Sequence, residues 1–313
     1  MLTPDIADFV ARTAAVYPAH AATLPIAEQR LIYDRYAASF TPPLPEGVRT
    51  EDRVFHAAAG HRIALRLYRP PPGGTRGCVL YFHGGGFVLG SLDSHQVVTA
   101  RLAADTGLRV IAVDYRLAPE HPAPAAHEDC LEVTRAALTG RLPGATDAPL
   151  LLAGDSAGAS VAAGIALRLR DAGCGKIAGM ALVYPMLGDE PQPPARDTEA
   201  HAPMLTLADI HAFRRHYWGA ARPPDWIAPL NAQRFDGLPP TLAIGVEHDP
   251  LRDDPRVFAE RIQAAGGTAR SWCGVGMVHG CWRALEVSVS ARRLHDEVCR
   301  FLRDSANNAA HPT

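Results

Sequence analysis

A serine flanked by two glycines is the clearest chemical feature of the sequence. In the stretch LLAGDSAGAS, residues 151–160, Ser156 has Gly154 and Gly158 two places to either side. The apolar LLLA before it predicts a strand, and ASVAAGIALRLRDAG after it predicts a helix that Gly173 ends. A serine on so sharp a strand-to-helix turn has a strained backbone and a projecting hydroxyl, and the residues two places away must lack side chains. The pattern therefore predicts that Ser156 is a nucleophile.

A run of three glycines is the second chemical feature. Gly84, Gly85 and Gly86 follow the apolar segment CVLYF, residues 78–82, which predicts another buried strand. Such a run lets backbone N–H groups turn into a cavity and form an oxyanion hole, where each donor is worth about a hundredfold or more in rate. The helix after Ser156 adds free N–H groups and the positive end of its dipole. A phosphate-binding loop is disfavoured, because neither a G-K-[ST] ending nor G-x-G-x-x-G spacing occurs here.

A base and an acid should accompany the serine. Its hydroxyl becomes nucleophilic when a histidine removes the proton, and a carboxylate orients that histidine. His279 lies in a glycine-rich loop after the last expected strand and completes the chain order Ser, Asp, His. Asp249 follows the expected strand TLAIGV, residues 241–246, and is the predicted carboxylate, with Glu247 as its main rival. These residue types in this order predict acyl transfer through a covalent intermediate.

The other acids and histidines receive structural interpretations. Asp254, followed by Pro255 at the first helical position, is interpreted as a helix cap, and Asp253 as a solvated loop acid. His248 precedes Asp249, and its role is left open. The remaining candidates are interpreted as ordinary surface, core or helix residues: His95, His201, His211, His216 and His295.

The order of apolar segments predicts the fold that positions these groups. From residue 78 onward, short apolar runs alternate with helical segments, which is typical of a mostly parallel sheet covered by helices on both faces. Before them, HRIALRLYRP alternates apolar and polar residues and predicts an antiparallel strand. Reactive groups in such a sheet collect at the carboxyl ends of its strands. The sequence therefore predicts the α/β class.

Two segments depart from this alternation, and we expect them to form a helical cap. Residues 1–45 carry apolar side chains at loosely helical spacing and end at TPPLPEG. Residues 187–225 join a proline-rich stretch to the amphipathic LTLADIHAFRRHYWG. The expected division is an N-terminal cap segment, 1–45, a catalytic domain, 46–186 and 226–313, and a cap insertion, 187–225.

Composition narrows the possible partners and cofactors. The 313 residues carry 31 basic and 33 acidic side chains, a net charge of -2, and no run of five like charges, so no nucleic-acid partner is expected. Residues 1–30 contain no apolar stretch of signal-peptide or membrane length, which favours a cytoplasmic protein without stable membrane insertion. The six cysteines form no C-x-x-C and are interpreted as buried thiols. The fourteen histidines form no H-E-x-x-H, so no metal is expected.

Several ordered motifs together resemble the hormone-sensitive lipase family of α/β-hydrolases, the bacterial esterases marked by H-G-G-G and G-D-S-A-G. The similarity runs from about residue 50 to the C-terminus. The matching stretches are FHGGGFVLGSLDSH (82–95), DYRLAPEHPAPAA (114–126), AGDSAGAS (153–160), YPML (184–187), PLNAQRFDGLPPTLAIGVEHDPLRDD (229–254) and GMVHGC (276–281). The resemblance implies an α/β-hydrolase fold, a mostly parallel central sheet flanked by helices with a helical cap, and no cofactor.

The resemblance also implies roles for individual residues. Ser156 would be the nucleophile, Asp249 the acid and His279 the base. The residues implied for the oxyanion hole are Gly84, Gly85, Gly86 and Ala157, with Gly84 shaping the loop and the other three donating their N–H groups. His83 and Asp155 would support this site without taking part in the chemistry.

Other family positions concern packing around the site. In DYRLAPEHP, the side chains of Asp114, Arg116 and Glu120 would make internal polar contacts. Three residues depart from the family pattern: Ala159, His248 and Cys281. Cys281 replaces a phenylalanine beside His279, so we expect looser packing or a larger pocket there, and a shifted acyl-chain preference in Cys281→Phe.

The function that follows is hydrolysis of small esters with short to medium acyl chains, through an acyl-enzyme. Activity should decline in acid, because the working base is neutral imidazole. An acetyl-hydrolase, a lactonase or an amidase would use the same groups, because pocket shape selects the leaving group. A non-catalytic ligand-binding member is disfavoured by the presence of His279. The family analogy also allows a homodimer formed through an edge strand or helix.

Overall fold

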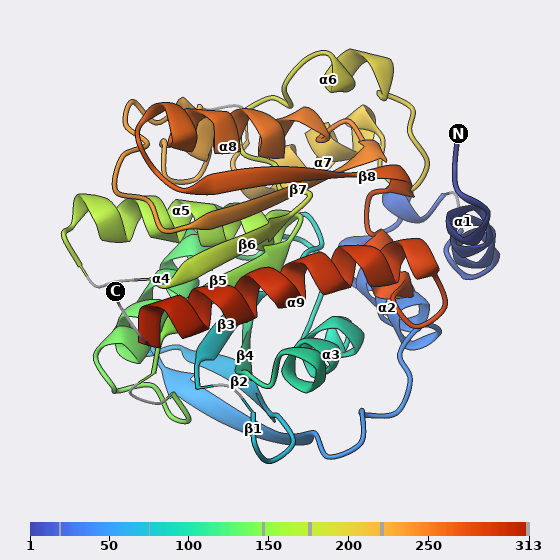
Figure 1. Ribbon diagram of the computed structural model, residues 1–313. Coiled ribbons are helices and arrows are strands. Elements are labelled where there is room, and N and C mark those ends of the chain that lie inside the picture. The colour runs from blue at the N-terminus through green and yellow to red at the C-terminus, as the bar shows by residue number, and fades with distance from the viewer. Residues whose placement is uncertain (19, 75, 146–147, 175–176, 220–221, 311–313) are drawn as a thin grey trace.

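A mixed β-sheet forms the centre of the protein (Figure 1). The computed structural model describes residues 1–310 apart from 19, 75, 146–147, 175–176 and 220–221. The strands are β1 (Arg49–His56), β2 (Arg62–Arg69), β3 (Cys78–Phe82), β4 (Arg109–Asp114), β5 (Leu150–Asp155), β6 (Gly179–Val183), β7 (Thr241–His248) and β8 (Ala269–Val278). Over the described residues, their order across the sheet is β1-β2-β4-β3-β5-β6-β7-β8.

The strand directions follow from the sequence patterns. Strands β3 to β8 run parallel, and β2 pairs antiparallel with both β1 and β4. The continuous apolar runs become central strands: β3, β5 and β6 are buried along their whole length. Along β2, Ile63, Leu65 and Leu67 are buried while the residues between them are partly exposed. The predicted mostly parallel α/β architecture with one antiparallel end is therefore confirmed.

Helices cover both faces of the sheet. They are α1 (Pro4–Val16), α2 (Ile26–Ala38), α3 (Gln96–Thr106), α4 (Ala125–Leu138), α5 (Ala157–Asp171), α6 (Ala195–Thr198), α7 (Leu207–Tyr217), α8 (Asp253–Ala264) and α9 (Val289–Ala310), with short 3-10 turns η1 (Ala21–Thr23), η2 (Pro229–Asn231) and η3 (Cys281–Ala284). Figure 1 shows α3 and α9 on one face and α4, α5 and α8 on the other. Two apolar clusters correspond to these faces: Leu80 and Phe82 point toward α5, and Val79 and Tyr81 toward α3 and α9.

The N-terminal segment, which was expected to be helical, contains helices α1 and α2. Ile6 and Phe9 of α1 are buried, and Tyr36 of α2 packs edge-on against Tyr17 and Phe40. Leu31, an apolar residue of α2, is exposed. The residues that pack α1 and α2 onto the body are thus fewer than the sequence pattern suggested.

Polar contacts fix the start of α1 to the start of α9. The Asp5 carboxylate accepts hydrogen bonds from the hydroxyl of Ser288 at 2.6 Å and from the backbone N–H of Ser290 at 2.8 Å. Thr3 adds a backbone hydrogen bond to Gly276 O at 3.1 Å. Burial opposes the charged form of Asp5, but the hydrogen bonds from Ser288, Thr3 and Ser290 hold its pKa below the ordinary value.

Two predictions about the start of α8 are wrong. Helix α8 begins at Asp253, so Pro255 is its third residue and Asp254 is no cap. The buried Asp254 carboxylate instead accepts backbone N–H groups of Leu187 and Gln192, both at 2.7 Å. Asp253 is buried and accepts the N–H of Ala195 at 2.9 Å, so it is no solvated loop acid. Both acids hold the beginning of the 187–225 segment, a contact between distant parts of the chain.

Two further structural facts concern cysteines and membranes. Cys78, Cys130, Cys281 and Cys299 are buried as expected, but Cys174 and Cys273 are exposed. Among the helices of the described residues, none is both long and apolar enough to cross a bilayer.

Candidate active site

Three predicted residues meet at the carboxyl ends of the strands. Ser156 follows β5, Asp249 follows β7, and His279 follows β8. Nε2 of His279 lies 2.9 Å from Oγ of Ser156, and its Nδ1 lies 2.7 Å from Oδ2 of Asp249. The fully buried Asp249 also accepts the N–H of Leu251 at 2.8 Å, which fixes the carboxylate. Because a carboxylate only accepts, Nδ1 carries the proton and Nε2 is free to accept one from the serine.

The backbone at the serine has the strained form that the sequence pattern implies. Ser156 has φ 51° and ψ -123°, outside the regions that L-residues prefer. A Cβ on Gly154 would lie 2.6 Å from the carbonyl carbon of Gly158, and a Cβ on Gly158 would overlap the carbonyl oxygen of Phe82. Only glycine fits at these two positions because strand β5, helix α5 and the end of β3 meet there.

The glycine loop, residues 84–90, presents backbone donors beside the serine. Gly85 has φ 117° and Gly86 φ 62°, conformations that glycine adopts without strain. Among the described residues, the N–H groups of Gly85, Gly86 and Ala157 donate to no protein acceptor. The N–H of Gly84 is already bonded to Oδ1 of Asp155 at 3.0 Å, which agrees with the expectation that Gly84 shapes the loop and is not a donor to the oxyanion.

Asp155 holds the glycine loop against the strand ends. Its buried carboxylate accepts the hydroxyl of Tyr81 at 2.5 Å as well as the Gly84 N–H. Nε2 of His95 lies 3.5 Å from its other oxygen, at the limit of a hydrogen bond. Burial alone would raise the pKa of Asp155, but the positive field of His95 and Arg283 and the hydrogen bonds hold it well below the ordinary value. His95, interpreted from the sequence as ordinary, therefore belongs to this polar group.

His83 supports the same loop from within the core. Its Nδ1 lies 2.8 Å from the carbonyl oxygen of Gly84 and donates to it, and its ring stacks on Tyr115 with centroids 4.3 Å apart. Burial, with a smaller contribution from His95, lowers the pKa of His83 to about 3, so the ring is neutral. A neutral, fully enclosed imidazole of this kind orders the loop.

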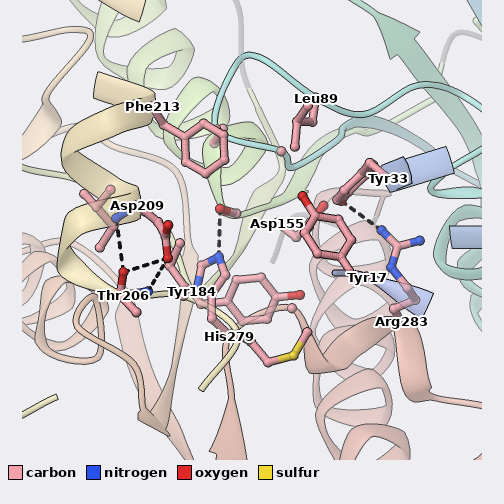
Figure 2. Close-up of a pocket in the computed structure, with 18 of the residues that line it drawn as sticks. Tyr17, Tyr33, Leu89, Asp155, Tyr184, Thr206, Asp209, Phe213, His279 and Arg283 are labelled. Atoms are coloured by element: carbon pink, nitrogen blue, oxygen red, sulfur yellow. Dashed lines mark hydrogen bonds between the residues drawn. The ribbon is translucent and has the colours of Figure 1, made fainter. Parts of the chain in front are cut away.

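Tyr184 is a site residue that the sequence reasoning did not single out. Its φ is 37°, a left-handed value that is costly for a bulky side chain. Its ring lies against the imidazole of His279, with centroids 4.5 Å apart at 51°, and Figure 2 shows the two side by side. The available signal was the position of YPML directly after strand β6, at the same sheet edge as the serine.

The site opens into one cavity of about 640 Å³. Its lining comes from the strand ends, the glycine loop, α1, α2 and α7. Most of the wall is apolar or aromatic, with Phe213 of α7 on one side and Tyr17 and Tyr33 on the other (Figure 2). Arg283 donates to the Tyr33 hydroxyl at 2.9 Å and lies over the Tyr36 ring. A cavity of this size accommodates a small, mostly apolar molecule.

The remaining acids and histidines lie away from the serine. Oε2 of Glu247 accepts the N–H of Gly276 at 2.6 Å, so Asp249 and not its rival contacts the histidine. His248 contacts Glu199 at 3.3 Å. Of the histidines interpreted as ordinary, His201 and His216 are exposed, His211 contacts Glu190 at 2.9 Å, and His295 contacts Asp105 at 3.0 Å.

Two expectations from the family resemblance need correction. Cys281 is buried in the core and is not part of the cavity lining, so its small side chain does not enlarge the pocket. Arg116 does bond to Asp129 and Glu120 to Arg30. Asp114, in contrast, makes no hydrogen bond through its side chain among the described residues, and burial raises its pKa to about 6.

Comparison with known proteins shows extensive similarity. A model of the α/β-hydrolase fold family matches residues 79–283. The chain is 40% identical over 245 residues to esterase LipI of Mycobacterium tuberculosis, covering 76% of both. It is 30% identical over 299 residues to an ethyl acetate hydrolase of Pseudomonas putida, covering 90% of this chain and 92% of that one. The hyperthermophilic esterase of the archaeon Pyrobaculum calidifontis superimposes with a TM-score of 0.88 at 29% identity, covering 97% and 99%.

Proposed function

Because the chain belongs to the hormone-sensitive lipase-like branch of the α/β-hydrolase family and is a carboxylic ester hydrolase, we propose that Ser156, His279 and Asp249 carry out the hydrolysis. The observation that carries the proposal is the continuous contact from Ser156 Oγ through His279 to Asp249, at 2.9 Å and 2.7 Å. Ser156 and His279 line the cavity, so a substrate bound there can reach the serine.

The first half-reaction forms an acyl-enzyme. Ser156 Oγ attacks the ester carbonyl carbon while His279 Nε2 takes its proton, and Asp249 stabilises the resulting imidazolium. The carbonyl oxygen becomes an oxyanion and accepts hydrogen bonds from the N–H groups of Gly85, Gly86 and Ala157. When the tetrahedral intermediate collapses, the bond to the alkoxy oxygen breaks, and His279 returns its proton to the departing alcohol.

The second half-reaction releases the acid. Water takes the place of the alcohol, His279 removes its proton, and the hydroxide attacks the acyl carbon. The same backbone donors stabilise the second oxyanion. Collapse returns the proton from His279 to Ser156 Oγ and frees the carboxylic acid, so the groups needed for both steps belong to the protein.

The cavity supports a substrate class. Its volume of about 640 Å³ and its apolar wall favour small, neutral esters with short to medium acyl chains. We propose that residues 1–45 and 187–225 act as a cap over the catalytic domain, 46–186 and 226–313. The cavity-lining side chains of α1, α2 and α7 support this division.

The family analogy further supports a homodimer, and we also propose a cytoplasmic location. Light scattering after size-exclusion chromatography tests the first, and the distribution of the native protein between cell fractions tests the second. A monomer at micromolar concentration, or recovery outside the cytoplasmic fraction, would argue against the respective proposal.

The proposed function is tested with p-nitrophenyl esters from acetate to dodecanoate. We expect a short-to-medium optimum for the wild type and a loss in kcat of about 10⁴-fold or more in Ser156→Ala. A serine-directed phosphonate should inactivate the wild type only. Ser305→Ala, which removes a buried serine hydroxyl on α9, is the matched control and should retain the wild-type rate. Turnover that survives Ser156→Ala would reject this mechanism.

A further inference from the structure

Helix α7 lies directly against the glycine loop. Phe213 projects from α7 toward the cavity (Figure 2), and a Cβ on Gly86 would overlap the Phe213 ring. The absence of a side chain at Gly86 therefore lets the helix approach the backbone of a residue that we propose as an oxyanion donor. The position of Gly86 and the position of α7 depend on each other.

A second contact joins the same two elements one residue further along. Phe87 has φ 64°, a left-handed value that few bulky residues adopt, and its ring stacks on Tyr217 at the end of α7. The ring centroids are 3.9 Å apart and the planes differ by 8°. Because the Phe87 ring is buried in this stack, the stack opposes relaxation of its backbone toward a common conformation.

Tyr217 is itself fixed from the other side. Its fully buried hydroxyl lies 2.7 Å from Nδ1 of His127 on α4, whose ring is also completely buried. Its carbonyl oxygen accepts the N–H of Ala123 at 2.7 Å. Phe87 O accepts the N–H of Ala118 at 2.8 Å, so both stacked residues are held by the same loop between β4 and α4. We call Phe87, Tyr217 and His127 the aromatic stack.

From these contacts we propose that Tyr217 is a positioning residue of the oxyanion hole: through the aromatic stack it holds Gly86 where its N–H meets the developing negative charge. The inference rests on the proposed function and adds a role for α7 beyond forming the cavity wall. An oxyanion donor acts only when it is aimed at the oxygen of the transition state, so a small displacement lowers kcat more than it weakens substrate binding.

Two variants separate the contribution of the Tyr217 ring from that of its hydroxyl. Tyr217→Phe keeps the stack and loses the contact with His127, and should lower kcat roughly threefold to tenfold with KM within twofold. Tyr217→Leu removes both and should lower kcat on the order of a hundredfold, the size of losing one oxyanion donor. Each variant is to be compared with the wild type on p-nitrophenyl butyrate.

A thionoester provides the readout that a merely structural role would not change. Its carbonyl sulfur is larger than oxygen and a poorer hydrogen-bond acceptor, so its hydrolysis depends less on the oxyanion hole. We therefore expect the kcat/KM ratio of p-nitrophenyl butyrate to p-nitrophenyl thionobutyrate to fall in both Tyr217 variants, further in Tyr217→Leu. A general loss of folded enzyme lowers both rates and leaves this ratio unchanged.

Phe258→Leu is the matched control. It removes a fully buried aromatic ring of α8 that packs edge-on against Phe235, away from the cavity. It should lower the melting temperature as Tyr217→Leu does, with the wild-type ratio of the two esters. If Tyr217→Leu does not fold, Tyr217→Phe alone carries the test.

The outcomes distinguish the two proposals. A constant ratio of the two esters in the folded Tyr217 variants, with or without lower kcat, would overturn the positioning role and leave Ser156 as nucleophile. Insensitivity of the wild type to the phosphonate would reject the proposed function itself, whatever the Tyr217 variants do. A falling ratio together with phosphonate inactivation would support both.

Discussion

Helices α1 and α7 wall the same cavity but are attached to the body in different ways. Helix α1 contributes Val10, Thr13 and Ala14 to the cavity wall, while Asp5 anchors its start to the start of α9. Helix α7 is anchored beside the chemistry, because Phe213 and Tyr217 lie against Gly86 and Phe87. Helix α1 is therefore fixed far from the glycine loop, whereas α7 is fixed by contacts with the loop itself.

This difference separates binding from chemistry. A disturbance of α1 changes the shape of the cavity, and an enzyme whose cavity is complete for only part of the time binds substrate more weakly. A disturbance of α7 also displaces the oxyanion donors, whose contribution appears in the transition state. We therefore expect a disturbance of α1 to raise KM and a disturbance of α7 to lower kcat.

The largest effect is expected at the contact between the glycine loop and α7. Gly86→Ala places a Cβ into the Phe213 ring at a residue with φ 62°, so loop or helix must move. We expect kcat/KM to fall about a hundredfold or more, about 3 kcal/mol of transition-state stabilisation. Gly140→Ala is the control, since Gly140 has φ 68° with open space around it and should lose stability but no activity. Equal losses of kcat/KM in Gly86→Ala and Gly140→Ala would show that backbone strain alone, and not the contact with Phe213, causes the effect.

As the pH falls, the unfolding free energy should decrease through the buried His127 beside α7 before it decreases through Asp5 of α1. Burial lowers the pKa of His127 from its ordinary 6.5 to about 3, so between these values the unfolded chain binds a proton that the folded protein excludes. The unfolding free energy should therefore decrease as pH falls below 6.5, by about 1.4 kcal/mol per pH unit for this histidine. His83, also lowered to about 3 by burial, adds a similar slope. The pKa of Asp5 is also lowered, but from an ordinary value of 3.8, so the stability that its hydrogen-bonded carboxylate contributes is lost only as the pH falls below about 4.

Urea unfolding at pH 7, 6 and 5 measures this slope. His127→Asn removes the titrating group, so its unfolding free energy should depend less on pH than that of the wild type. His201→Asn replaces an exposed histidine and serves as the control. Parallel slopes for wild type and His127→Asn would show that protonation at His127 does not control acid stability.

The smallest effect is expected at the α1 anchor. Asp5→Ala removes the acceptor for Ser288 and Ser290, hydrogen bonds worth on the order of 1 kcal/mol each. We expect KM for p-nitrophenyl butyrate to rise severalfold, with kcat within twofold. Asp8→Ala, an exposed acid on the same helix, makes the same charge change and should leave both constants at the wild-type values. A fall in kcat without a rise in KM would contradict the division between the two helices.

The sequence predicts the parts of this molecule that depend on local pattern. Period and composition are enough to place the parallel strands, and Ser156, Asp249 and His279 each follow a strand, so the topology brings them to one edge. The strained turn at Ser156 follows from its two flanking glycines, because their effect is confined to a few residues.

Contacts between distant segments were beyond that reasoning. Asp254 looks like a helix cap in the sequence, but its hydrogen-bond partners Leu187 and Gln192 lie more than sixty positions earlier. The pairing of Phe87 with Tyr217 likewise depends on how α7 packs, which neither residue's neighbours specify. Such partners are fixed by tertiary packing, which periodicity does not encode.

The hydrogen bonds between Asp5 and the start of α9 also determine when, during synthesis of the chain, α1 can be fixed in its final position. Ser288 is 283 positions later in the chain than Asp5, so α1 is synthesised long before the residues that hold it exist. Until then, Ile6 and Phe9 lack the part of their apolar cluster that α9 contributes. A nascent chain carrying this apolar helix is therefore open to aggregation or chaperone binding until its last helix emerges from the ribosome.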